Sequence, residues 1–151
     1  MYTLVLSLHS WLRWVALIAG IVATVSALSN RAPNGKGAAN VWGLVLMISL
    51  DVQLLIGVLL YVALSPLTAA AMRDFGSAMR NPGLRFFAVE HVALMLAAAV
   101  LAHVGRIMAR KAKTAESRRS RLVVCFGLAT LAMLFAIPWP GTASSRPLFR
   151  L

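Results

Sequence analysis

Four long apolar stretches, separated by short polar segments, dominate the pattern of this chain. They cover residues 3–28, 41–64, 86–108 and 122–139. Each has about 18 to 26 residues, which is enough for a helix to cross a hydrocarbon core of roughly 30 Å. The pattern predicts a single all-α domain over residues 1–151, an integral membrane four-helix bundle with up-and-down topology.

The polar segments refine this prediction. No basic residue precedes the first stretch, and the stretch is too long for the core of a signal peptide, so we expect a retained span. Residues 68–79 mix apolar side chains with Arg73 and Asp74, which is typical of a short helix on the membrane surface. The tail over residues 141–151 is polar but ends in apolar side chains. We expect it to dock either on its own bundle or on a partner subunit.

Basic residues exceed acidic residues by 15 to 4, which gives a formal net charge of +11. Their crowding between the apolar stretches indicates contact with lipid head groups and no nucleic-acid partner. Nine of them lie in or beside the segments that follow the first and third stretches. Five lie in the segment after the second stretch, at its border with the third, or in the tail. The positive-inside rule therefore predicts both termini on the non-cytoplasmic side. The nine are Arg31, Lys36, Arg106, Arg110, Lys111, Lys113, Arg118, Arg119 and Arg121.

Two histidines are the strongest candidates for chemistry. His9 and His91 each lie in an apolar stretch, about one and a half to two turns from its start. The first and third helices of an up-and-down bundle are parallel, so the two imidazoles lie at one depth. Histidines that face each other across a bundle core are the arrangement of axial haem ligation. The alternative is that each only donates to a backbone carbonyl or to water.

Stripes of small residues follow each histidine at three- and four-residue spacing. Such stripes let a neighbouring helix or a flat cofactor approach the backbone closely. The sequence thus predicts a slot for one haem b, with His9 and His91 as the iron ligands. After His9 the stripe consists of Arg13, Ala16, Gly20, Ala23 or Thr24, and Ala27, and after His91 it consists of Met95, Ala98, Ala102 and Gly105.

Arginines are the candidate charge partners. Arg13 lies one turn deeper than His9 and pairs either with an acid, for which Asp51 is preferred, or with a haem propionate. Arg85, at the mouth of the third stretch, is the better-placed propionate partner because propionates point toward water. An alternative assigns Asp51 and Glu90 to a proton path or a quinone site, since ionisable groups inside a membrane are functional by default.

His103 is a weaker candidate. It follows His91 by 12 residues, which places it about 18 Å along the helix and some 120° around it. Di-haem bundles need their histidines on one face, so a second haem with Met47 as its other ligand fits poorly. We expect His103 to pair with Asp51 or a backbone carbonyl, or to join Arg106 at the interface.

Several segments together resemble a group of small bacterial four-helix membrane proteins labelled cytochrome b-like. The resemblance covers nearly the whole chain. It implies non-covalently bound haem that exchanges electrons with quinone or a partner complex, in the bacterial inner membrane. It carries over no ligands beyond His9 and His91, so a single haem near the outer face is expected. The segments are His9–Trp14, Asp51–Tyr61, Glu90–His91 and His103–Arg106.

Three functions remain open at this stage. The leading one is a membrane electron-transfer protein with one b-type haem, working as an accessory subunit of a larger respiratory or photosynthetic complex. The second is a cofactor-free structural or assembly subunit of a membrane complex. The third is a proton-coupled or quinone-handling protein. The chain has no covalent haem-attachment motif and no phosphate-binding glycine loop, so a carrier or subunit is favoured over an enzyme.

Overall fold

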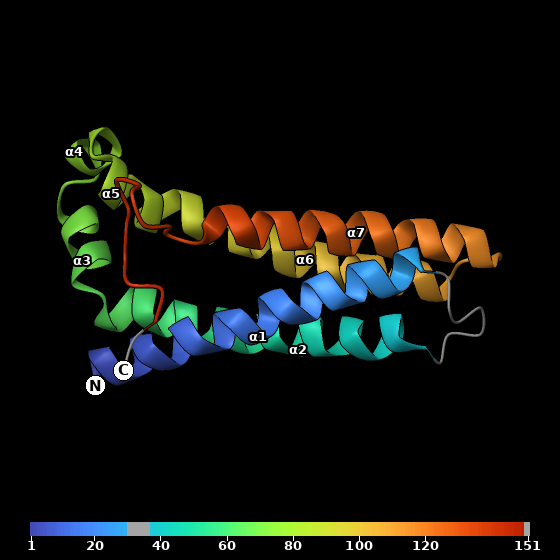
Figure 1. The fold of residues 1–151 in the computed structure, drawn as a ribbon. Helices are drawn as coiled ribbons and strands as arrows, with labels where there is room; N and C mark the ends of the chain where they lie inside the picture. Colours follow the sequence, from blue (N-terminus) through green and yellow to red (C-terminus); the bar gives the residue numbers. More distant parts are fainter. Residues whose placement is uncertain (30–36, 150–151) are drawn as a thin grey trace.

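A computed structural model describes residues 1–29 and 37–149 (Figure 1). Within these ranges the chain forms helices and no strand. Four helical segments are long and apolar enough to cross a membrane, which confirms the all-α, four-span architecture and indicates a multi-pass membrane protein. These segments are Tyr2–Leu28, Ala38–Leu64, Pro82–Arg110 and Ala115–Ala136.

Two of the four spans contain a short π-helical segment. The first and last spans are single helices, α1 (Tyr2–Leu28) and α7 (Ala115–Ala136). The second span is α2 (Ala38–Leu59) followed by the π-helix η1 (Leu60–Leu64). The third span is assembled from α5 (Pro82–Arg85), the π-helix η2 (Phe86–Glu90) and α6 (His91–Arg110). The π-helical segments lie at the end of the bundle where the third span begins (Figure 1).

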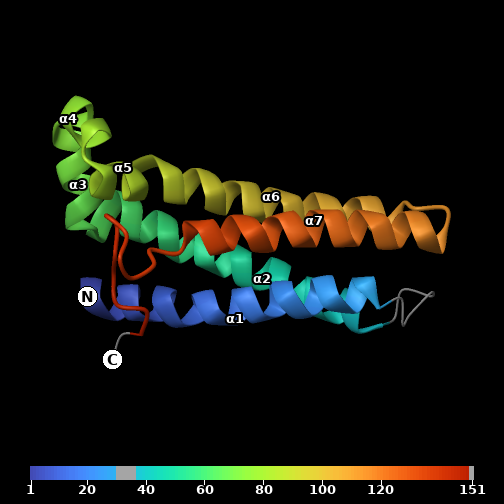
Figure 2. The same cartoon turned by 45° about the horizontal axis from the view of Figure 1, so that its top comes forward.

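The four spans form a ring in the order α1, α2, α6, α7. Helix α1 packs on α2 and α7, and α6 packs on α7 and α2. Helices α1 and α6 are therefore diagonal partners that run in the same direction. Figures 1 and 2 show both termini at the same end of the bundle, the end that also carries the short helices.

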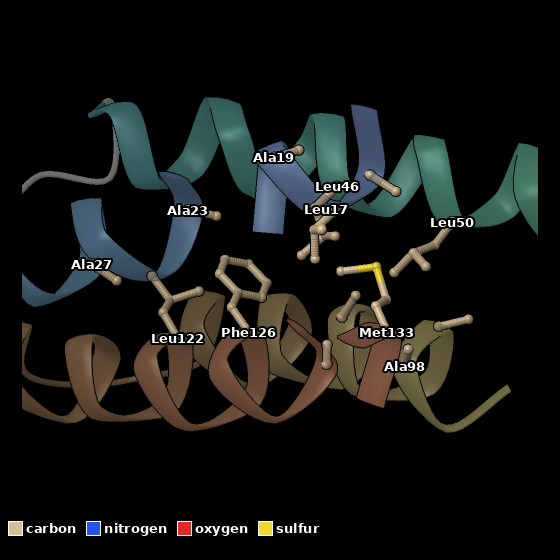
Figure 3. Close-up of a cluster of buried hydrophobic side chains, with 14 of the residues drawn as sticks. Leu17, Ala19, Ala23, Ala27, Leu46, Leu50, Ala98, Leu122, Phe126 and Met133 are labelled. Carbon is tan, nitrogen blue, oxygen red and sulfur yellow. The ribbon is translucent and has the colours of Figure 1, made fainter. Parts of the chain in front are cut away.

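Small residues fill the centre of the bundle, where the spans meet (Figure 3). The small residues of the predicted stripes are buried, and Ala16, Ala23, Ala98 and Ala102 are at most 1% exposed, whereas Thr24 and Met95 are half-buried. Three larger side chains, Leu46, Leu50 and Phe126, are also fully buried. Outward side chains such as Leu55, Val62 and Phe135 are 72%, 77% and 71% exposed. An apolar outer surface of this kind suits contact with lipid tails.

The surface segment between the second and third spans differs from the single helix predicted over residues 68–79. It forms two short helices, α3 (Pro66–Arg73) and α4 (Phe75–Arg80). The helical conformation is interrupted at Asp74. The carboxylate of Asp74 accepts a hydrogen bond from the backbone N–H of Ser77 and so caps α4. This bond stabilises the charged form and lowers the pKa of Asp74.

At the opposite end of the bundle, two arginines donate hydrogen bonds to carbonyls at the C-terminal ends of helices. Arg119 donates to the carbonyl of Leu28 at 2.7 Å, and Arg121 donates to that of Met108 at 2.6 Å. Both carbonyls lie in the last turn of a helix, where the backbone lacks intrahelical donors. Part of the basic cluster that the sequence analysis assigned to topology and lipid contact therefore also caps helices.

Candidate functional site

Two histidines meet inside the bundle at the end that carries the termini. His9 lies on the second turn of α1, and His91 is the first residue of α6, directly after η2. Their ring centroids are 6.2 Å apart, with 64° between the ring planes. The structure thus brings the two side chains together at the same depth, as predicted for parallel helices.

The spacing of the two rings suits a shared metal ion. A bond between a first-row metal ion and an imidazole nitrogen is about 2 Å long. Two imidazoles on opposite sides of one ion therefore have ring centres about 6 Å apart. Unlike a structural zinc site, this site has only two such ligands, since the described residues hold no group of three or more metal-ligating side chains. A cofactor that brings its own equatorial ligands needs only these two.

Hydrogen bonding prepares His91 for such a role. Its Nδ1 lies 2.8 Å from the carbonyl oxygen of Ala136, the last residue of α7. A carbonyl only accepts, so Nδ1 carries the proton and Nε2 of the neutral ring keeps a lone pair. A backbone carbonyl on the second nitrogen is the usual way in which proteins orient a metal-binding histidine.

His9 presents an unsatisfied polar atom. Its Nδ1 is buried and has no hydrogen-bond partner in the part of the chain that the structure describes. The amide oxygen of Gln53 on α2 is likewise buried and has no hydrogen-bond partner among the described residues, and Gln53 is 2% exposed. Buried polar atoms without partners are rare in folded proteins and indicate a bound group or water.

The histidines border a cavity of about 220 Å³. A single water needs roughly 10–15 Å³ by the same kind of measure, so the cavity has room for a much larger group. Residues from α1, α2, η1, α3, η2, α6 and α7 and from the C-terminal tail line it. Most of the lining is apolar, and the polar side chains are Tyr2, His9, Ser10, Arg13, Gln53, Tyr61, Ser65, Thr68, His91 and Arg146.

The cavity is positively charged. Arg13 and Arg146 line it, whereas none of the four acidic residues of the chain does. Two guanidinium groups in an apolar, low-dielectric setting attract an anionic group more strongly than the same groups do in water.

Neither family models, curated proteins nor solved structures include a match to this chain. The chemistry of the cavity must therefore be argued from its own residues.

Other predicted site residues lie elsewhere. Arg85 does not line the cavity, and its Nε donates to Glu90 at 2.6 Å. Both side chains are nearly half exposed, at 45% and 42%. Met47 on α2 is half-buried and also lies outside the lining. Neither Glu90 nor Asp51 borders the cavity, so the acids assigned to a proton path do not meet there.

The prediction that Asp51 forms an ion pair with Arg13 is wrong. The structure places Asp51 beside His103, with 3.5 Å between Oδ2 and Nε2, and not beside Arg13. His103 Nδ1 also lies 2.9 Å from the carbonyl of Ala99, as expected for a histidine that is held by its own helix. Arg13 instead turns toward the tail and donates to the carbonyl of Leu148. Helix rotation, which the sequence leaves open, decides which of the two neighbours Asp51 meets.

Sequence reasoning missed Arg146. Arg146 is one of the five basic residues that the positive-inside count places at the other ends, and the tail has no periodicity from which its path can be read. The apolar end of the tail did indicate docking, and the structure realises the docking on the chain's own bundle. Phe149 stacks on Trp14 with ring centroids 5.4 Å apart.

Proposed function

We propose that this protein is a membrane electron-transfer protein that binds one b-type haem between His9 and His91. The observation that carries the proposal is the pair of imidazoles, 6.2 Å apart on diagonal helices at the edge of a cavity. A b-type haem supplies one-electron exchange at its iron and is held without covalent bonds.

The surrounding residues favour this cofactor class. The carbonyl of Ala136 orients His91, and the ring of His9 faces the cavity from α1. Gly57 of α2 leaves space beside His9, since a Cβ there would stand 3.5 Å from its Cε1. The apolar walls exclude water, and the two arginines offset negative charge. Burial and nearby charge are the means by which a protein sets a haem potential.

The setting of the site suggests how the protein works. Most of the described residues belong to the four apolar spans, and the cavity with its two histidines lies between these spans. We therefore assign it to the bacterial inner membrane as an accessory subunit that exchanges electrons with quinone or with a larger respiratory or photosynthetic complex. The charge distribution favours a site near the non-cytoplasmic face.

The test is an optical spectrum of the purified protein, reconstituted with haem in detergent. We expect a Soret band and a sharp α band in the reduced-minus-oxidised difference spectrum, because bis-histidine ligation gives low-spin iron. His9→Ala and His91→Ala should each abolish the α band. His103→Ala is the matched control and should keep it, because His103 lies outside the cavity lining.

Two outcomes contradict the proposal. A wild-type protein that is folded by circular dichroism and stays colourless after reconstitution is a cofactor-free subunit. A difference spectrum that survives in both His9→Ala and His91→Ala places any haem elsewhere.

A further inference from the structure

The C-terminal tail crosses the end of the bundle that carries the short helices, from α7 to α1 (Figures 1 and 2). After α7 the chain turns at Gly141, whose φ of 87° suits glycine. The backbone N–H of Arg146 then donates to the carbonyl of Pro138 at 3.3 Å. The start of the crossing segment is thus tied to the end of α7.

The other end of the crossing segment is tied to α1. The carbonyl of Leu148 accepts from Arg13 at 2.7 Å and from Trp14 Nε1 at 3.4 Å. Phe149 packs on Trp14 and lies 5.7 Å from Trp11 between ring centroids. The backbone of Arg146 is thus held at the first of these ties, two residues before the second tie at Leu148. Arg146 and Pro147 both line the cavity.

The guanidinium of Arg146 has no anionic partner in the described part of the chain. Its Cζ lies 5.5 Å from the ring centre of Phe87, which also lines the cavity. Stacking on an aromatic face leaves the five N–H donors of an arginine in need of acceptors. By contrast, Arg85 already holds Glu90. Arg146 is therefore the arginine that is positioned to receive a carboxylate from a group in the cavity.

We propose that Arg146 is the carboxylate-binding residue of this cavity and that the tail serves to carry it there. The inference rests on the proposed function, in which the ligand is a haem with two propionates. Arginine recognises a carboxylate through two parallel hydrogen bonds, which fix position as well as charge. Arg13 adds positive charge from α1. A lipid or fatty acid offers the same anionic chemistry, so the test separates the two sources.

The experiment compares two probes, ferric protoporphyrin IX and its dimethyl ester, titrated into the full-length apoprotein in neutral detergent. The ester lacks the carboxylate charge but keeps the iron and the ring. We expect the wild type to bind the free acid about 10-fold more tightly than the ester or better, as for a hydrogen-bonded charge pair. Arg146→Gln should reduce this ratio to near one while the α band of the reduced complex persists.

Comparing this affinity ratio between the wild type and the variant cancels the greater tendency of the ester to partition into detergent, because partitioning affects both proteins equally. Arg85→Gln is the matched control and should keep the wild-type ratio. Arg146→Lys should restore part of it, because lysine supplies the charge without the bidentate geometry. The persistence of the α band separates this role from a general loss of fold or of ligation.

Each further outcome is decisive. If neither probe binds to the wild type, the proposed function and this inference both fail. If both probes bind and Arg146→Gln keeps the preference for the free acid, only the inference fails. If excess oleate competes with the probes in the wild type but not in Arg146→Gln, and the ester ratio is unchanged, Arg146 binds a lipid carboxylate and the haem version is overturned.

Discussion

Glycine at two helix positions lets large or rigid neighbours come close. A Cβ at Gly43 of α2 would lie 2.5 Å from Cζ of Phe126, which is only 1% exposed. A Cβ at Gly105 of α6 would collide with Cβ of Cys125 on α7. A Cβ atom moves only with its backbone, so this second contact cannot relax by a rotamer change. The glycine therefore sets how closely α6 and α7 pack.

Gly105→Ala should destabilise the protein by about 1–3 kcal/mol, the usual cost of adding a methyl group to a tightly packed interface. Gly127→Ala on α7 is the control, because its Cβ would stand an ordinary 3.7 Å from Thr24. It should be neutral or stabilising by up to ~1 kcal/mol, since alanine favours helix over glycine. Unfolding by denaturing detergent, followed by circular dichroism, measures both. Equal stability of the two variants would contradict the close packing of α6 and α7.

At the scale of elements, the two π-helical segments shape the end of the bundle that holds the cavity. The hydroxyl of Tyr61 in η1 donates to the carbonyl of Ala88 in η2 at 2.8 Å, which joins the second span to the third. The N–H of Ser65 bonds to Leu60, and Pro66 has no N–H, so the carbonyl of Tyr61 lacks a backbone donor. The hydroxyl of Thr68 supplies it at 2.7 Å. π-Turns widen a helix and are frequent beside functional sites.

Thr68→Val should cost about 1–3 kcal/mol, because valine keeps the shape of threonine but leaves the carbonyl of Tyr61 without a donor. Thr68 is 4% exposed, so water does not easily replace the hydroxyl. Thr3→Val at an exposed position of α1 should change the free energy of unfolding by less than about 0.5 kcal/mol. The same detergent unfolding assay applies. An unchanged midpoint for Thr68→Val would show that η1 does not depend on this bond.

At the scale of the whole molecule, the number of spans and the distribution of basic residues together predict the orientation of the protein in the membrane. An even number of spans returns both termini to one end, as Figure 1 shows. The opposite end carries seven of the twelve basic residues that the structure describes, and two of these, Arg119 and Arg121, also cap α1 and α6. Because the membrane orients a protein by its short basic loops, this end is expected to face the cytoplasm.

A fusion of a periplasm-dependent phosphatase to the C-terminus should therefore be active in cells, whereas a fusion in the loop over residues 111–114 should be inactive. Replacing Arg110, Lys111, Lys113 and Arg118 by serine removes basic charge from that loop and spares the capping residues Arg119 and Arg121. It should lower phosphatase activity at the C-terminus by mixing the two orientations. An active loop fusion in the unaltered protein would reverse the orientation.

The sequence by itself determined the spans and the depth of the two histidines. Four apolar stretches of membrane length admit only helices, because lipid offers no partner for backbone N–H and C=O groups. His9 and His91 each lie near the start of a helix in the same direction, so their common depth follows from counting residues. The boundaries followed less closely: α7 begins at Ala115, ahead of the predicted residue 122, because Thr114 caps it.

Only the tertiary structure decided which side chains share the cavity. The rotation of each helix about its axis comes from packing against its neighbours, so Asp51 meets His103 rather than Arg13. The path of an irregular tail has no periodicity to read, so Arg146 entered the lining unpredicted. Local hydrogen bonding, in turn, holds Arg85 at Glu90 and outside the lining. The depth of a residue in the membrane follows from counting along its helix. The composition of a site also depends on how each helix is rotated and on where the loops and the tail run.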